Sequence, residues 1–274
     1  MTGNGQVAAG DRVETARAAA EAGAAVAAEH FRTGLPVERK EGKTDVVTAA
    51  DREAEAAALE RIEAEFPGEV VVAEESAGEV AVPEDGPAWV VDPIDGTNNF
   101  VRGIPLWATA VAAVVDGDAV ASAVVLPALG DTYVADDAET RLNGERVTVS
   151  ERTDPERMAV APTVWWDFDR RDEYATAATE IVDRFGDLTR LRSAQVTLGM
   201  VAAGSLDGTF TNLTPHPWDS VAGVHLVRQA GGRVTDLDGE PWRHDGRGFV
   251  ASNGRRHEEV LAAARAVEAV AERE

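Results

Sequence analysis

The sequence has no cysteine, and this absence excludes disulfide bonds, thiolate-bound zinc and cysteine nucleophiles. Aromatic residues make up only 5% of the 274 residues. No apolar run approaches the roughly 20 residues that a membrane-spanning helix needs. Residues 1–12 show neither the basic segment nor the apolar core of a signal peptide. We therefore expect a soluble, cytoplasmic protein that is long enough to bury a sizeable core.

Positive charge is also scarce. Asp and Glu number 49 against 26 Lys and Arg, a formal net charge of −23, and only Lys40 and Lys43 are lysines, so 24 basic residues are arginines. Such a field repels nucleic acids and anionic membranes, and we expect neither as a partner. Because the acidic residues are spread along the chain, we infer adaptation to high salt, where screening relieves their repulsion. An anionic substrate would need bound cations that reverse the local field.

Helix and strand patterns are mixed along the chain without regular alternation. Helical patterns cover about 12–32, 48–66, 171–185, 195–203, 217–232 and 255–272. Strand patterns cover 70–75, 88–93, 107–115, 118–126, 131–136, 145–150, 188–193, 206–212 and 233–239. We find no internal repeat and no low-complexity linker. This mixture predicts layered α/β or α+β sheets instead of a barrel.

The stretch "WVVDPIDGTNNF" sets two aspartates three positions apart at the end of an apolar strand pattern. Pro93 fixes its own φ and cannot donate a hydrogen bond, so we expect the strand to break there. In a turn, Asp92 and Asp95 can face the same way and meet one cation. Gly96 admits unusual backbone conformations, and Thr97 then opens a helical turn whose free N–H groups suit a phosphate. A plain Asp-Pro surface turn is the alternative.

Four further acidic residues, in three motifs, are ambiguous when each motif is taken alone. Glu74 and Glu75 end the strand pattern "VVVAEES" and fit either a metal site or a solvated acidic pair. Asp219 follows a proline at a predicted helix start, where an aspartate commonly serves as an N-terminal helix charge. Thr48 and Asp51 fit a capping box. Only their combination with the aspartate pair favours a shared site.

Together these motifs resemble those of the inositol monophosphatase family, within the lithium-sensitive, Mg²⁺-dependent phosphatases that include archaeal-type fructose-1,6-bisphosphatase/inositol monophosphatase. "DVVTAAD", "AEES", "DPIDGTNNF" and "PWDSVAGVHLVRQAGG" stand in the family's order and spacing, from about Asp45 to Asp236. Haloacid-dehalogenase-type phosphatases differ, because their aspartates stand two apart and one is a nucleophile. The resemblance implies a layered α/β/α/β/α sandwich and commonly a homodimer. It also implies a single domain over 1–274, with subdomains of about 1–150 and 151–274.

The resemblance implies a role for each matching residue. Two or three Mg²⁺ ions, which prefer oxygen ligands, would be held by Glu74, Asp92, the Ile94 carbonyl, Asp95 and Asp219. Asp51 with Thr97, assisted by Glu74, would orient and deprotonate a metal-activated water that attacks phosphorus in line, without a covalent phosphoenzyme. The amides of Gly96 and Thr97 would hold the phosphate. Lys40 would lie in a loop near the weaker, third metal position.

The substrate side departs from the family's pattern. Its glycine-serine/threonine-alanine segment, which lines the sugar or inositol, appears here as Arg192-Ser193-Ala194, and Asn212 stands where inositol-specific members carry an acidic residue. Asp219 would also face the substrate. Arg192 either meets a second phosphate through its planar fork or points outward into the acidic surface.

We expect the substrate to be a small polyol or sugar phosphate monoester, with inositol-1-phosphate and fructose-1,6-bisphosphate as the main candidates. Two other substrates, 3′-phosphoadenosine-5′-phosphate and histidinol phosphate, are alternatives within the same chemistry. A non-catalytic regulatory protein that keeps the fold is the alternative from a different class. The intact set of predicted ligands argues against that alternative.

Overall fold

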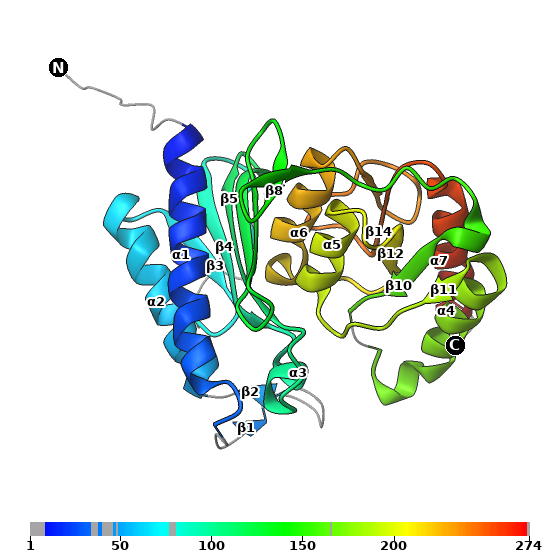
Figure 1. Ribbon diagram of the computed structural model, residues 1–274, viewed down its shortest axis with the longest axis horizontal. Helices are drawn as coiled ribbons and strands as arrows, with labels where there is room; N and C mark the ends of the chain where they lie inside the picture. Colours follow the sequence, from blue (N-terminus) through cyan, green and yellow to red (C-terminus); the bar gives the residue numbers. More distant parts are fainter. Residues whose placement is uncertain are drawn as a thin grey trace.

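The helices and strands stack in five layers (Figure 1). The computed structural model describes residues 9–33, 38–39, 46–47, 49–76, 81–164 and 166–272. Helices α1 (Ala9–His30) and α2 (Ala49–Glu65) cover one face of a seven-stranded sheet. Helices α5 (Ala194–Ala202) and α6 (Pro217–Gln229) lie between it and a five-stranded sheet, whose other face carries α4 (Arg171–Arg184) and α7 (His257–Ala271). This arrangement confirms the predicted α/β/α/β/α sandwich.

The seven-stranded sheet takes its strands in chain order. They are β3 (Val70–Ala73), β4 (Pro87–Asp95), β5 (Ala108–Val115), β6 (Asp118–Leu126), β7 (Asp131–Ala135), β8 (Thr140–Leu142) and β9 (Glu145–Val147). Only β3 and β4 are parallel neighbours; the other pairs are antiparallel. Two hairpins turn at Asp116-Gly117 and Asn143-Gly144, and φ is positive at all four residues. Asp-Gly and Asn-Gly tolerate such turns, which match the twist of the strands.

The five-stranded sheet has the order β11-β10-β12-β14-β13. Its strands are β10 (Ala159–Pro162), β11 (Asp187–Leu188), β12 (Gly208–Thr211), β13 (Arg233–Thr235) and β14 (Phe249–Ser252). The remaining elements are short: β1 (Glu38–Arg39), β2 (Val46–Val47), α3 (Thr97–Val101), η1 (Pro155–Arg157) and η2 (Phe168–Arg170). Among the described residues, no helix has both the length and the apolar character needed to cross a membrane.

Strand β4 lies inside the seven-stranded sheet and is buried on both faces. Trp89 and Val91 belong to the apolar cluster under α1 and α2, whereas Val90 belongs to the cluster that includes α5 and α6. Because side chains alternate along a strand, Asp92 follows Val90 onto the α5 and α6 side. The continuous apolar run before Asp92 therefore anchors it between the two sheets.

Candidate active site

The predicted strand break at Pro93 is wrong, because β4 continues to Asp95 through a bulge. Asp92 pairs with Ala110 and Asp95 with Ala108, so β4 advances three residues while β5 advances two. In a regular strand, residues three apart point to opposite faces. One extra residue restores a common face. The proline's missing N–H falls within this irregular stretch, so the strand continues beyond it.

Acidic side chains from β4 and from neighbouring parts of the chain lie close together at this bulge. One carboxylate oxygen from each of Asp92, Asp95 and Asp219 lies within 4.8 Å of the other two. Asp219 is the third residue of α6, and its Oδ2 also accepts the backbone N–H of His216 at 3.3 Å, so it serves the helix start as well. Glu74 follows β3 directly, beside Asp92, because Ala73 at the end of β3 is in register with Val91 of β4. The structure thus brings together four of the predicted metal-binding side chains.

Burial and like charge make Asp92 an unfavourable carboxylate in the absence of a cation. Its side chain is 2% exposed. Burial raises the pKa of Asp92 well above its usual range, and Glu74, Asp95, Asp219 and Asp51 raise it further. Among the described residues, Asp92 Oδ1 has no hydrogen-bond partner. A buried lone pair of this kind fits a metal ligand.

The donor set as a whole fits Mg²⁺. It offers carboxylate oxygens from β4 and α6, that of Glu74 after β3, and the Ile94 carbonyl, with neither histidine nor cysteine among the predicted ligands. Hard divalent cations prefer such oxygen ligands. A cation here would also offset the repulsion among the buried carboxylates.

Asp95 is held by the N-terminus of α5. It accepts hydrogen bonds from the Ser193 hydroxyl, from the Ala194 amide at 3.1 Å and from the Gln195 amide at 2.7 Å. These bonds lower the pKa of Asp95 and oppose the larger effect of burial, which raises it. Ser193 and Ala194, which we expected to line the substrate, thus position Asp95, a predicted metal ligand. Gln195 was missed, although it follows them at the same helix start.

Gly96 is required by both conformation and space. Its φ is 87°, and a Cβ there would lie 3.0 Å from the Ser193 Cβ and 3.3 Å from the Arg192 carbonyl oxygen. Helix α3 begins at the next residue, as the sequence predicts, and the Thr97 hydroxyl donates to the Ile94 carbonyl at 3.0 Å. A carbonyl oxygen has a second lone pair, so this bond leaves Ile94 able to bind a cation.

Asn99 joins this turn to the segment before α5 and was also missed. It is buried, and its Nδ2 donates to the carbonyl oxygens of Leu106 and Leu191, at 2.7 Å each. A buried amide with two carbonyl acceptors fixes the distance between two parts of the chain that are remote in sequence. No local pattern marks this asparagine as different from Asn98.

Arg192 lies next to the predicted phosphate-binding turn. It is half-buried and adopts a left-handed φ of 63°, which is uncommon for a residue with a long side chain. Burial lowers the pKa of Arg192, and the charge of Arg102 lowers it further, while Tyr174 opposes both effects. Two guanidinium groups therefore act on each other near Gly96.

Asn212 does not join the acidic cluster. Its Oδ1 accepts from Trp166 Nε1 at 2.8 Å, and its Nδ2 donates to Glu173 at 2.5 Å and to Glu268 at 3.3 Å. These contacts support an internal structural role, and its substrate role stays a prediction. Asp51, on α2, is 1% exposed and acts electrostatically on Asp92. Lys40, Lys43 and Thr48 lie outside the described residues.

The chain resembles known proteins over most of its length. The model of the "Inositol monophosphatase family" matches residues 11–269. A Thermotoga maritima protein named fructose-1,6-bisphosphatase/inositol-1-monophosphatase is 35% identical over 230 residues, which cover 82% of this chain and 84% of that protein. The Nus factor SuhB of Escherichia coli K12 is 33% identical over 229 residues, covering 81% and 84%. A solved IMPase of T. maritima has a TM-score of 0.84 at 32% identity, covering 94% of this chain and 96% of that chain.

Proposed function

The chain belongs to the inositol monophosphatase family, and from this premise we propose that it is a Mg²⁺-dependent phosphatase of small polyol or sugar phosphates. The observation that carries the proposal is the buried cluster of Asp92, Asp95 and Asp219, with oxygens within 4.8 Å of one another. These three carboxylates, Glu74 and the Ile94 carbonyl would hold the ions. Bound Mg²⁺ supplies Lewis acidity, which activates water and offsets charge on the phosphoryl oxygens.

The side chains around the cluster would orient the reaction. Asp51 accepts the proton of the attacking water, and the Thr97 hydroxyl, anchored on Ile94, helps to orient that water. The amides at Gly96 and Thr97 bind phosphate oxygens at the start of α3. Ser193 keeps Asp95 in place from the opposite side. Water performs the displacement in line, so no residue becomes phosphorylated.

Arg192 favours a substrate with a second phosphate. It occupies the position of the family's glycine with φ 63°, a conformation that costs a non-glycine residue about 1–2 kcal/mol. Strain of this kind is retained where the side chain has a use. A planar guanidinium binds phosphate oxygens in pairs. We therefore place fructose-1,6-bisphosphate ahead of inositol-1-phosphate, with hydrolysis of both by one enzyme.

Phosphate release in high salt with Mg²⁺ tests the proposed activity. The panel compares inositol-1-phosphate, fructose-1,6-bisphosphate, 3′-phosphoadenosine-5′-phosphate and histidinol phosphate. Asp95→Asn and Asp219→Asn should each lower kcat by at least about a hundredfold, whereas the exposed Asp238→Asn should not. Near-normal turnover in the first two variants would refute the metal site. No release from any substrate would refute the activity.

Arg192→Gly tests the choice of substrate separately. It restores the family's residue and relieves the backbone, so a folding defect is not expected. KM for fructose-1,6-bisphosphate should rise about tenfold, while kcat/KM for inositol-1-phosphate should stay within about twofold. Asn143→Gly is a matched control, because it relieves a similar φ of 52° in a distant hairpin. Equal effects on both substrates would refute a second phosphate subsite.

A non-catalytic regulatory role is the second candidate, because the relative from E. coli is named a Nus factor. Retention of the complete acidic set argues against loss of catalysis. A folded protein that binds Mg²⁺ but releases phosphate from no substrate would favour the regulatory role. We further propose a homodimer, which light scattering at several protein concentrations would test.

A further inference from the structure

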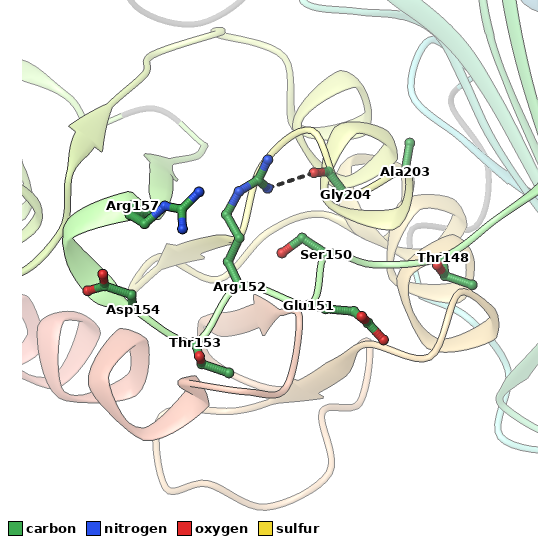
Figure 2. Close-up of a pocket in the computed structure, with 9 residues that line it drawn as sticks. All are labelled: Thr148, Ser150, Glu151, Arg152, Thr153, Asp154, Arg157, Ala203 and Gly204. Atoms are coloured by element: carbon green, nitrogen blue, oxygen red, sulfur yellow. Dashed lines mark hydrogen bonds between the residues drawn. The ribbon is translucent and has the colours of Figure 1, made fainter.

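A hollow lies away from the acidic cluster, where the chain crosses from one sheet to the other. Thr148 and residues 150–154, between β9 and η1, line a space of about 510 Å³ together with Arg157 of η1 and with Ala203 and Gly204, after α5 (Figure 2). Helix α5 separates this space from the candidate active site, because its first residues hold Asp95 and the residues after its end line the hollow. Nine residues of helix span about 13 Å.

Two arginines point into this space. Figure 2 shows the guanidinium groups of Arg152 and Arg157 directed toward the same region, while the Glu151 carboxylate lies on the other side of the chain. Asp154 is also at the rim, but its Oδ1 caps η1 by accepting the Glu156 amide at 3.2 Å. Of the two carboxylates in the lining, Asp154 is engaged at η1 and Glu151 points elsewhere, so both guanidinium groups face the hollow.

A buried network fixes one of these arginines in place. Asp207 is 1% exposed and accepts hydrogen bonds from the Ser150 hydroxyl and from Arg152 Nη1, the latter at 3.3 Å. The same Nη1 donates to the Gly204 carbonyl at 3.1 Å, and Asn253 Nδ2 donates to the Arg152 carbonyl at 3.0 Å. Within the described part of the chain, Nη1 makes all the hydrogen bonds of Arg152. Its Nε and Nη2 groups are left for a ligand.

Glu151 and Asp154 line the same hollow as Arg157, but within the described residues neither forms an ion pair with it. Acidic residues outnumber basic ones by 49 to 26. Nevertheless, Arg157 is exposed and, among the described residues, makes no ion pair. Asp207 offsets part of the charge of Arg152, and an oxyanion in the hollow would add charge-assisted hydrogen bonds from both guanidinium groups.

We propose that this hollow, the Arg152–Arg157 pocket, binds the phosphate group of a small polar phosphate ester. The volume lies in the range of small-molecule sites and exceeds the needs of an inorganic ion. Hydroxyl and charged side chains dominate its lining, with Ala203 as the one apolar side chain, so it suits a polar ligand. The pocket joins the crossover segment to the end of α5 and suits an effector distinct from the substrate.

Arginine side-chain NMR of the full chain in EDTA tests the pocket independently of hydrolysis. Inorganic phosphate and glycerol 3-phosphate are titrated, with glycerol as the uncharged control. The Nε–H signal that Arg157→Gln removes identifies that side chain. We expect both phosphates to shift this signal saturably, with the ester binding at least as tightly as the ion. No saturable shift would overturn the proposal.

Matched variants locate the bound anion. Arg152→Gln should weaken the binding seen at Arg157 about tenfold, and Arg157→Gln should weaken the binding seen at Arg152 equally. The exposed Arg157 makes the second variant safe for folding. Arg243→Gln removes the same charge from an exposed ion pair with Asp245 and should change affinity less than twofold. An effect of Arg243→Gln equal to that of Arg157→Gln, or loss of binding on Arg192→Gln alone, would overturn the proposal.

Discussion

Replacement of Asp92 by Asn should stabilise the metal-free protein, although Asp92 is buried. Asp92 is buried among Glu74, Asp95, Asp219 and Asp51, which all disfavour its charge. Asparagine keeps the shape of the side chain and removes that charge. Such a gain in stability is expected where residues are selected for binding and not for folding.

The size of the gain follows from the spacing of the oxygens. At the 4.8 Å limit, one pair of carboxylates repels by about 3.5 kcal/mol at an effective dielectric constant of about 20. Protonation limits this cost, because holding an aspartate neutral at pH 7 costs about 4 kcal/mol relative to the unfolded chain. The asparagine amide still lacks a full set of partners, which costs about 1–3 kcal/mol. We therefore expect a gain of about 2 kcal/mol.

The direction in which the free energy of unfolding changes with pH follows from the raised pKa of Asp92. Above the ordinary aspartate pKa, the unfolded state loses this proton more readily than the folded state does. The wild-type free energy of unfolding in EDTA therefore falls as pH rises from about 4 toward neutral, and part of this fall should vanish in Asp92→Asn. The stabilising effect of the variant is thus larger at pH 7 than at pH 5.

Urea unfolding at constant high salt, followed by tryptophan fluorescence, measures this difference in EDTA and in Mg²⁺. Asp207→Asn is the control, because Asp207 is equally buried but accepts bonds from Ser150, Arg152 and Ala159. The control should lose about 2 kcal/mol. In Mg²⁺, the wild type should gain more stability than Asp92→Asn does. If Asp92→Asn is as destabilised as the control in EDTA, the buried repulsion does not exist.

Three further predictions concern other parts of the chain. Gly96→Ala should lower the free energy of unfolding in urea by about 2 kcal/mol and lower kcat at least about tenfold, because its Cβ would lie 3.0 Å from the Ser193 Cβ at φ 87°. Gly68→Ala, with open space around it, is the control and should affect stability alone. Burial lowers the pKa of His225 from 6.5 to about 4, so the free energy of unfolding should fall by up to about 3 kcal/mol as pH falls across that window. His225→Gln should flatten this pH dependence, and an unchanged pH profile in the variant would contradict the prediction. The net charge of −23 predicts a melting temperature that rises between about 0.1 and 2 M KCl, and no rise would refute salt adaptation.

The sequence singles out Asp92, Asp95 and Asp219, which cluster in the structure, because each lies in a compact local motif. It does not predict how Asp92 and Asp95 reach one face, since the bulge is defined only by pairing with Ala108 and Ala110 on β5. The apolar run before Asp92 indicated burial on both faces, which is correct. The break predicted at Pro93 is wrong because the prediction did not include pairing with β5, which accommodates the proline in a bulge.

Two short strands and the contacts between residues far apart in the chain were also not predicted from the sequence. Strands β10 and β14, of four residues each, were not predicted, and pairing with β12 in the five-stranded sheet gives them their extended form. The Gln195 amide reaches Asp95 across 100 positions. No local stretch of sequence contains both groups, so the hydrogen bonds that hold Asp95 could not be predicted from the sequence.

The candidate metal site therefore depends on the contact between two halves of the chain as much as on its own motif. Strand β4 supplies Asp92 and Asp95, while the starts of α5 and α6 supply the donors to Asp95 and the carboxylate of Asp219. Gln195 strengthens this junction, because its Nε2 donates to the Trp218 carbonyl at 2.6 Å, beside Asp219. A small shift of α5 relative to α6 would change the distances among all three carboxylates. Rigid packing between the sheets thus sets the geometry that a cation requires.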